Sequence, residues 1–377
     1  MGAATAMFPQ RAGRRGWRSF DLQLLLYVLL LIGFGIAVGY SAGHGETAAG
    51  GLPQPVKTLI WSGIGLGAFF VAARLDPAWL RALALPIYAA VIAMLLLTLL
   101  VGTRLFGAQM SVSVAGLDFQ LSEISKVLVV LVLAAYLSRR AERVRSPSTI
   151  VVAGAIAAGP TLLVLRQPDL GTALVFVAIL GGMLFTAGAA LGWLGAIAAV
   201  ATAAAPVWIG MLADYQRQRF LCFLDPNADP QGACYQLVQA LDAVASGGWT
   251  GQGLTAGRHN QLGQLPVQST DFIFTVVAEE LGFAGSVVLL GLFALLIWRM
   301  LVIAWEAGDG FGAMVGVGLA SMVAFQLLVS VGMSVGLMPV TGIPLPFVTY
   351  GGSSLISLLF GMGLLESIRI RSRRPPL

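Results

Sequence analysis

Long apolar stretches alternate with short polar segments along most of the chain. Each stretch is close to the roughly 20 residues that an α-helix needs to cross a membrane. The pattern predicts ten membrane-spanning helices, at residues 21–40, 56–73, 82–101, 120–138, 148–165, 170–188, 190–211, 272–298, 312–336 and 351–368. We therefore expect an all-α polytopic membrane protein, folded as a single transmembrane domain over residues 1–377.

The basic residues predict how this bundle is oriented. Loops on the cytoplasmic side of a membrane carry an excess of Lys and Arg. With the N-terminus in the cytoplasm, 15 of the 22 Lys and Arg residues lie on the cytoplasmic side, six lie outside, and Lys126 falls within a span. Both termini are therefore expected in the cytoplasm. The basic start is expected to stay as an anchor, because the first apolar stretch is longer than the core of a cleaved signal peptide.

One connection is much longer than the others. Residues 212–270, between the seventh and eighth predicted spans, are too polar to cross a membrane and are expected outside. Loops of this length are usually functional or disordered. Apolar residues recur in it at helical spacing and predict a short amphipathic helix, which could lie on the membrane or in a cavity. These residues are Cys234, Leu237, Val238, Leu241, Val244 and Ala245.

Two irregular outside segments are also expected. Glycine-rich turns follow the predicted amphipathic helix at residues 246–248 and 251–253. Residues 338–346 contain three prolines, which forbid a regular helix because proline lacks the N–H donor and clashes with the preceding turn.

Composition narrows the class of protein further. Hydrophobic residues make up 58% of the chain and charged residues only 10%, whereas a soluble domain carries about 25% charged residues. Soluble, fibrous and disordered proteins are thereby excluded. The net charge of +5 does not indicate nucleic-acid binding, because the cations lie in short loops and form no basic face. No phosphate-loop motif occurs, so no nucleotide cofactor is expected.

Cys222 and Cys234 are the chain's two cysteines, and both are expected outside. That compartment is oxidising, so they could form a disulfide, or each could simply be buried. With only two cysteines and two histidines, a His/Cys metal cluster is not expected.

Glu123 and Lys126 are charged residues within a predicted span, where burial costs several kcal/mol. Their i, i+3 spacing places them on one face of a helix. They could form an internal ion pair that only fixes packing. Alternatively, Lys126 could present its charge to an anionic head group.

Asp271 opens the eighth predicted span, at the end of the long loop. Ser, Thr and Asp before an apolar run are typical of a helix N-cap. At the outer membrane face, this carboxylate could instead deprotonate a hydroxyl or hold a divalent cation such as Mg²⁺ or Mn²⁺. Glu279 and Glu280 follow about two turns later; being adjacent, they cannot share a helix face.

Two further charged groups lie at the expected outer face. The turn Arg166-Gln-Pro-Asp169 could contain a local Arg–Asp pair. Arg217 and Arg219 begin the long loop, and alternate spacing in an extended segment would place both on one side, where they suit a phosphate or pyrophosphate. They could equally anchor the loop at the lipid head groups.

Several long blocks of the sequence resemble the SEDS family (shape, elongation, division and sporulation proteins, of the RodA and FtsW type). They run in family order from the fourth predicted span to the C-terminus, and the last is closer to RodA. The blocks are Phe119-Gln-Leu-Ser-Glu-Ile-Ser-Lys126, Arg166-Gln-Pro-Asp-Leu-Gly-Thr172, Tyr215-Gln-Arg-Gln-Arg219, Phe223-Leu-Asp-Pro226, Thr270-Asp-Phe-Ile-Phe-Thr-Val-Val-Ala-Glu-Glu-Leu-Gly282 and Pro339-Val-Thr-Gly-Ile-Pro-Leu-Pro-Phe-Val-Thr-Tyr-Gly-Gly-Ser-Ser354.

The resemblance implies ten spans and a peptidoglycan glycosyltransferase of the bacterial cytoplasmic membrane. Such an enzyme polymerises lipid II, releases undecaprenyl pyrophosphate and works with a class B penicillin-binding protein. In the family, the acidic residue matching Asp271 is essential. The residues matching Glu123 and Lys126 are also functionally important, and Asp169 matches the Asp of its own block.

The sequence departs from the family pattern at several positions. Polar or special residues of the family are replaced at Met110, Ser111, Leu121, Cys234, Val267, Ser330 and Ser334. These changes leave open an altered substrate preference, a specialised paralogue or weak activity.

The predicted chemistry is attack by the 4-hydroxyl of one lipid-linked disaccharide on the anomeric carbon of another. Asp271 is the candidate base or metal ligand, and Lys126, Arg217 and Arg219 are candidates for the pyrophosphate. A single carboxylate with no covalent partner favours inversion at the anomeric carbon. A lipid II flippase and a non-catalytic scaffold for the penicillin-binding protein remain alternatives. A role in elongation, division or sporulation is left open.

Overall fold

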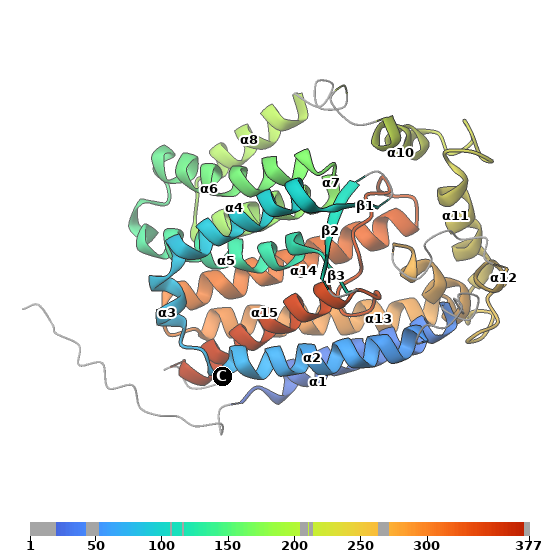
Figure 1. Ribbon diagram of the computed structural model, residues 1–377, viewed down its shortest axis with the longest axis horizontal. Coiled ribbons are helices and arrows are strands. Elements are labelled where there is room, and N and C mark those ends of the chain that lie inside the picture. The colour runs from blue at the N-terminus through green and yellow to red at the C-terminus, as the bar shows by residue number, and fades with distance from the viewer. Residues whose placement is uncertain are drawn as a thin grey trace, which may run out of the picture.

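Long helices packed side by side make up most of the molecule (Figure 1). The computed structural model describes residues 20–42, 53–105, 108–114, 117–203, 210, 214–262 and 271–372. Within these ranges, nine helices are long and apolar enough to cross a membrane. They are α1 (Leu22–Ala42), α2 (Gln54–Arg74), α4 (Ala84–Val101), α5 (Leu121–Arg139), α6 (Pro147–Arg166), α7 (Leu170–Ala187), α13 (Ile273–Glu306), α14 (Gly310–Ser334) and α15 (Gly352–Arg371). The predicted all-α polytopic membrane fold is confirmed.

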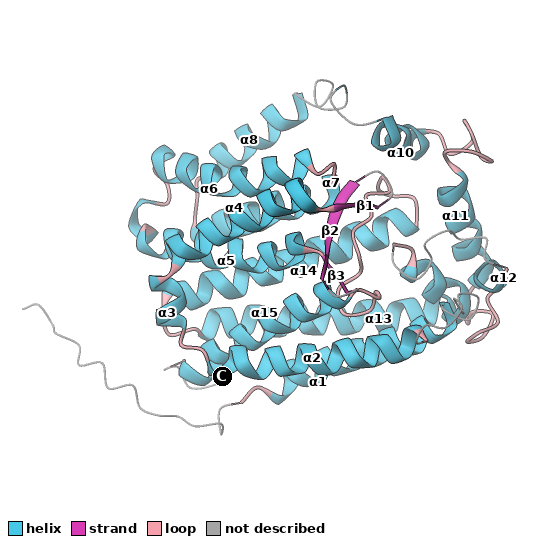
Figure 2. Cartoon of the chain, viewed as in Figure 1, coloured by secondary structure: helices cyan, strands magenta, loops and turns pink. Residues whose placement is uncertain are grey.

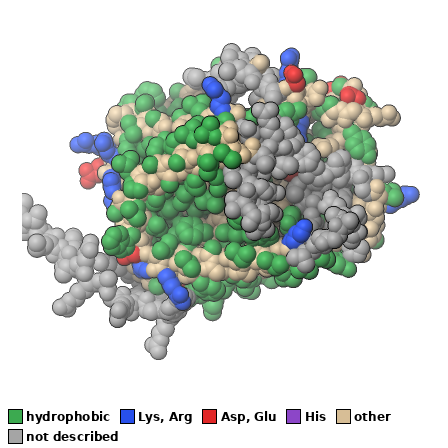
Figure 3. Space-filling view, in the orientation of Figure 1, with side chains coloured by type: hydrophobic (Ala, Val, Ile, Leu, Met, Phe, Trp, Pro, Cys, Tyr) green, Lys and Arg blue, Asp and Glu red, His purple; other side chains and the backbone are tan. Residues whose placement is uncertain are grey.

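The seventh predicted span is described only in part. Helix α8 (Leu191–Ala203) covers its first 13 residues, and most of the remainder lies outside the described residues, as do the N-terminal residues before 20. Figure 3 shows the surface expected of a membrane protein: hydrophobic side chains cover the middle of the visible face, and most of the described charged side chains lie at its rim.

A small antiparallel sheet lies between α4 and α5, where no strand was predicted (Figure 2). Strands β1 (Thr103–Leu105), β2 (Ala108–Val114) and β3 (Leu117–Phe119) pair in the order β1-β2-β3. In β2, Ser111 pairs with Thr103 and Ser113 with Asp118. Polar and apolar residues alternate along this strand, which is a two-residue period typical of β-structure.

The buried centre of the bundle is formed by α5, α14 and α15. Helix α14 packs against α5, α7 and α13, and α15 packs against α2 and α5. Small residues allow this close packing: a β-carbon on Gly318 would contact Val130 of α5 and Met183 of α7. The interior positions of α5 are therefore those most shielded from lipid, which matters because α5 carries the charged pair predicted at residues 123 and 126.

Helix α13 is longer than predicted and is broken near its start. The prediction ended at residue 298 because Arg299 follows, but the helix continues to Glu306 and Arg299 forms an ion pair with Asp21. At Gly282 the backbone is non-helical, with φ of 65°. The break separates a short first part, which follows Asp271, from a long second part.

Shorter helices complete the fold. Helix α3 (Pro77–Ala82) precedes α4, and the 3₁₀-helix η2 (Ala141–Arg143) joins α5 to α6. Helices α10 (Asp214–Leu224), α11 (Tyr235–Gly247) and α12 (Arg258–Gln261) lie in the long loop and group at one end of the bundle in Figure 1. The predicted amphipathic helix is α11, which packs on α13 and α14. Its buried face includes Leu237, Ala240 and Ala243, whereas Ala245 is exposed.

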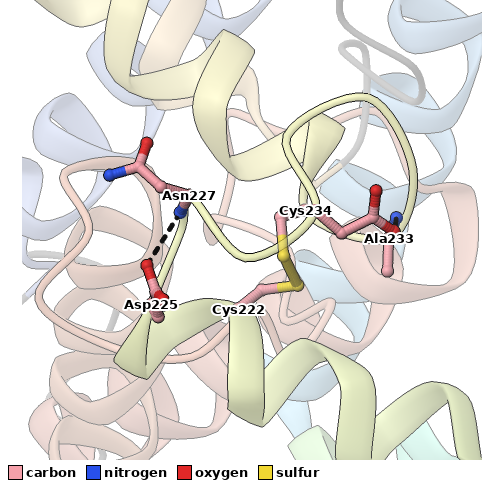
Figure 4. Close-up of a disulfide and its surroundings, with 6 residues drawn as sticks. Cys222, Asp225, Asn227, Ala233 and Cys234 are labelled. Atoms are coloured by element: carbon pink, nitrogen blue, oxygen red, sulfur yellow. Dashed lines mark hydrogen bonds between the residues drawn. A yellow bond between two sulfur atoms is a disulfide. The ribbon is translucent and has the colours of Figure 1, made fainter.

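A disulfide between Cys222 and Cys234 joins α10 to the start of α11 (Figure 4). Their Cα atoms are 5.2 Å apart, and both side chains are buried in a small cluster with Leu237 and Phe272. Of the two alternatives for these cysteines, the disulfide is therefore present, together with burial. The bond also gives a structural reason for Cys234, one of the departures from the family pattern.

Candidate functional site

Asp271 lies immediately before the first turn of α13. The helix begins at Ile273 with Phe272 in the N-cap position, so the prediction that Asp271 itself could be the N-cap is wrong. The side chain lies at the same end of the bundle as the long loop. Its carboxylate is therefore positioned by the start of α13 without serving as that helix's N-cap residue.

Gly342 brings Asp271 and Arg219 together. A β-carbon placed on this glycine would lie 3.4 Å from Asp271 Oδ2 and 3.8 Å from Arg219 Nη1. The glycine has a positive φ of 74°, which favours a residue without a side chain. A carboxylate and a guanidinium thus flank one exposed stretch of backbone.

Arg219 is held on helix α10 by contacts with its own first turn. Its guanidinium lies 5.8 Å from the centre of the Tyr215 ring. The Tyr215 hydroxyl and Gln216 Nε2 both donate to the carbonyl of Pro168, at 2.7 Å and 2.8 Å. Burial raises the pKa of the Tyr215 hydroxyl, with Arg219 opposing the shift and Asp169 adding to it. Helix α10 is therefore docked on the turn between α6 and α7.

The pairing predicted for Arg217 and Arg219 is wrong in its geometry. Residues 214–224 form helix α10, not an extended segment. Residues two apart on a helix point in different directions, since each residue advances by about 100°. Arg219 is half-buried beside Tyr215, whereas Arg217 is exposed. The structure thus brings Arg219, but not Arg217, to the site.

Asp169 occupies the N-cap of α7 and accepts a hydrogen bond from Thr172 N at 2.9 Å. Burial raises its pKa, opposed by the Thr172 hydrogen bonds and by the charge of Lys126, while Glu123 raises it further. The ion pairs found among the described residues do not include the local Arg166–Asp169 pair. Asp169 instead interacts electrostatically with the charged pair on α5.

Glu123 and Lys126 form the buried ion pair predicted from their spacing. Lys126 Nζ donates to Glu123 Oε1 at 2.6 Å, and both side chains are 2% exposed. Removing two charges from water is costly, so a buried pair is weak support for stability and is often kept for another reason. With Asp169, two carboxylates share one ammonium group at this point of the bundle.

Glu279 and Glu280 hold the long loop against α13. Glu279 accepts from the backbone N–H of His259 at 2.8 Å and of Asn260 at 3.3 Å. Glu280 accepts from Ser41 Oγ at 2.5 Å and Asn260 Nδ2 at 2.7 Å. The two carboxylates thus diverge, as predicted for adjacent residues, and both fasten helix α12.

The glycine-rich turns satisfy the backbone groups freed by the break in α13. Gln252 N and Gly253 N donate to the carbonyls of Glu279 and Glu280, at 3.0 Å and 2.9 Å. On the other side, Phe283 N donates to the Gly248 carbonyl at 2.9 Å. A β-carbon on Gly282 would collide with the Thr250 and Gly251 backbone. The long loop is therefore an integral part of the helix that carries Asp271.

The site combines predicted and unpredicted residues. Glu123, Lys126 and Asp169 are linked through Tyr215 to Arg219 and, across Gly342, to Asp271. Tyr215 and Gly342 belong to sequence blocks that were noticed but given no role. Among the described residues, no group of three or more His, Cys, Asp or Glu side chains is arranged to hold a metal. Asp271 could nevertheless bind Mg²⁺, which often takes one or two protein carboxylates and completes its shell with substrate phosphates and water.

Comparisons with known proteins agree with the resemblance in the sequence blocks. The family model for FtsW, RodA and SpoVE, described as a cell cycle protein, matches residues 22–374. The chain is 38% identical to peptidoglycan glycosyltransferase MrdB of Escherichia coli over 352 residues, which cover 92% of this chain and 93% of that protein. It is 34% identical to stage V sporulation protein E of Bacillus subtilis, covering 94% and 98% of the two chains.

Solved structures share the fold. A structure described as "Structural coordination of polymerization and crosslinking by a peptidoglycan synthase complex" matches with a TM-score of 0.78 and 31% identity, covering 94% of this chain and 98% of that one. The rod shape determining protein RodA of Thermus thermophilus matches with a TM-score of 0.69 and 28% identity, covering 95% and 99%. The multi-pass membrane architecture is therefore shared over nearly the whole chain.

Proposed function

The chain belongs to the FtsW, RodA and SpoVE family of cell cycle proteins, and from this we propose that it is a peptidoglycan glycosyltransferase. Its substrate is lipid II, which it polymerises into glycan strands at the outer face of the bacterial cytoplasmic membrane. The observation that carries the proposal is the meeting of Asp271 and Arg219 across Gly342, beside the buried group of Glu123, Lys126 and Asp169.

The reaction needs a base on one side and cations on the other. The 4-hydroxyl of the acceptor sugar attacks the anomeric carbon of the donor, and a new C–O bond forms there. The bond from that carbon to the pyrophosphate breaks, and its electron pair leaves with undecaprenyl pyrophosphate. Asp271 takes the proton of the attacking hydroxyl as general base. With one carboxylate acting on the acceptor and no covalent intermediate, the anomeric carbon is inverted.

The leaving group is stabilised by positive charge near the pyrophosphate. Arg219 is the group best placed for this, since its guanidinium flanks the same glycine as Asp271. Lys126 contributes a positive field from within the bundle, although Glu123 neutralises part of it. Arg217 lies exposed on α10 and would act at the rim, through the head group of an incoming lipid. Bound at Asp271, Mg²⁺ or Mn²⁺ would supply additional charge neutralisation.

The membrane setting and the partner follow from the family. We place both termini in the cytoplasm, and the end with α10, α11 and α12 outside, in line with the distribution of Lys and Arg. A class B penicillin-binding protein would crosslink the strands that this chain makes. The similarity to a peptidoglycan synthase complex that couples polymerisation and crosslinking supports such a partner.

The proposal is tested with the purified full chain and its class B penicillin-binding protein in proteoliposomes containing fluorescent lipid II. Lysozyme-sensitive polymer should form, and it should be lost when the chain is omitted. Transbilayer movement of lipid II without polymer would contradict the proposal and support a flippase. Neither polymer nor movement, together with normal binding of the penicillin-binding protein, would support a scaffold.

A further inference from the structure

The segment between α14 and α15 passes through the bundle without regular structure. Its side chains are largely buried, including Val340, Ile343 and Leu345. Irregular backbone at membrane depth is tolerated where it is enclosed by protein or lines a polar cavity, because its N–H and C=O groups must find partners. The location of these partners is therefore informative about what the segment does.

Residues 341–343 lie between the start of α7 and the pair formed by Asp271 and Arg219. A β-carbon on Gly171, in the first turn of α7, would lie 2.9 Å from the carbonyl oxygen of Thr341 and 2.8 Å from Ile343 Cγ1. On the opposite side, Gly342 approaches Asp271 and Arg219. The segment is thus held in place by close packing that only glycine allows at residues 171 and 342.

The polar groups of this segment lack protein partners. Thr341 Oγ1 is buried and has no hydrogen-bond partner. The hydrogen bonds found among the described residues include none from the backbone N–H groups of Gly342 or Ile343. Shortly afterwards the chain is satisfied again, since Leu345 N donates to Thr349 Oγ1 at 2.8 Å. Unsatisfied donors are therefore concentrated where the segment meets Arg219.

We propose that Thr341 Oγ1 and the N–H groups of Gly342 and Ile343 form an anion-binding element for the pyrophosphate of the lipid-linked donor. Successive N–H groups next to a residue with positive φ form concavities that bind anions, and Gly342 has such a φ. The inference rests on the proposed glycosyltransferase function and deepens it.

Neutral donors suit this place chemically. A further cation here would pair with Asp271 and draw the carboxylate away from the acceptor hydroxyl. A threonine hydroxyl and two N–H groups attract the pyrophosphate without forming that ion pair. They also hydrogen-bond more strongly as negative charge develops on the leaving oxygen, which is the stage at which stabilisation accelerates the reaction.

The test uses a hydroxyl-free variant, a hydroxyl-retaining variant and a matched control. Thr341→Val keeps the shape and removes Oγ1, whereas Thr341→Ser keeps the hydroxyl. Thr149→Val is the control, because Thr149 Oγ1 is also buried without a partner but lies in the first turn of α6. If Thr341 only packs, removing its unpartnered hydroxyl should leave activity unchanged, and stability unchanged or higher.

The measurement is lipid II polymerisation by the full chain with its penicillin-binding partner, with undecaprenyl pyrophosphate added as inhibitor. Thr341→Val should lower kcat/KM and weaken the inhibition, each by about tenfold, since a hydrogen bond to a charged group is lost. Thr341→Ser and Thr149→Val should stay near wild type, and thermal unfolding should show all three folded. If Thr341→Val does not fold, Thr341→Ala serves as the hydroxyl-free variant.

The outcomes separate this inference from the proposed function. Polymerisation by wild type with an unchanged inhibition constant in Thr341→Val would overturn the anion-binding element and leave the glycosyltransferase intact. Absence of polymer from wild type would overturn the proposed function, and this inference with it.

Discussion

The two ends of helix α13 carry charged clusters that differ in how fully the protein satisfies them. Near its C-terminal end, Arg299 Nη2 contacts Asp21 Oδ2 at 2.5 Å, and Arg369 pairs with both Asp21 and Glu306. Asp21 also accepts from Leu24 N at 3.0 Å. Near its N-terminal end, Gly342 stands between Asp271 and Arg219, and the buried hydroxyl of Thr341 has no partner.

The difference indicates a structural cluster at one end and a ligand-binding one at the other. Opposite charges in direct contact leave little capacity for a ligand. Charges that flank a glycine, beside donors without partners, leave room for one. The comparison predicts that mutations at the Asp21 end change stability alone, and that mutations at the Asp271 end change activity with or without a change in stability.

The largest effect on stability is expected at the Glu123–Lys126 pair, which separates the two kinds of role within one site. Lys126→Met leaves the Glu123 carboxylate buried without its partner and should lower the free energy of unfolding by about 3–5 kcal/mol. The double variant Glu123→Leu with Lys126→Met should recover most of that stability but not polymerisation. Denaturation in detergent and the lipid II assay measure the two quantities. Recovery of both in the double variant would reduce the pair to a packing device.

A smaller loss of stability is expected at the Asp21 end. Asp21→Asn removes the charge that Arg299 and Arg369 share, and should cost about 2 kcal/mol, because Arg299 is partly exposed and Glu306 still pairs with Arg369. Polymerisation per folded molecule should stay at the wild-type rate. A fall in kcat at unchanged folded fraction would show that the two ends are not functionally distinct.

The smallest effect is expected from the pH dependence of Asp169. Burial raises the pKa of its carboxyl above the ordinary value of 3.8, so the folded protein is penalised where the group ionises. This penalty is absent below pH 3.8 and grows as pH rises toward the folded pKa. Asp169→Asn keeps an N-cap side chain and should be more stable than wild type at neutral pH, with the difference vanishing in acid. A pH-independent difference in unfolding free energy would contradict the raised pKa.

Much of the bundle was predictable because lipid imposes a simple rule on sequence. Apolar length alone located the nine described spans, and i, i+3 spacing gave the Glu123–Lys126 pair. The β-strands were missed although β2 alternates polar and apolar residues, because apolar length was the pattern used. The extent of α13 was missed because a charge was taken as its end, whereas Asp21, distant in sequence, pairs with Arg299.

The site was predicted as a set of residues but not as an arrangement. Spacing assumed an extended segment for Arg217 and Arg219, and helix α10 separates them. The roles of Gly342, Gly282 and Gly251 depend on which backbone approaches them, and no local pattern encodes that. Among the departures from the family, Cys234 is explained by its disulfide. Val267 and the side chains of Met110 and Ser111 lie outside the part of the chain that the structure describes.

The central claim is that Asp271 is the base of a glycosyltransferase, and Asp271→Asn tests it most directly. The matched control is Asp242→Asn on the exposed face of α11. With the penicillin-binding partner and fluorescent lipid II, Asp271→Asn should lower the polymerisation rate by about 10²–10⁴-fold, as loss of a general base does. Its thermal unfolding should stay close to wild type, and Asp242→Asn should keep full activity. Strand synthesis by folded Asp271→Asn at the rate of the Asp242→Asn control would contradict the account.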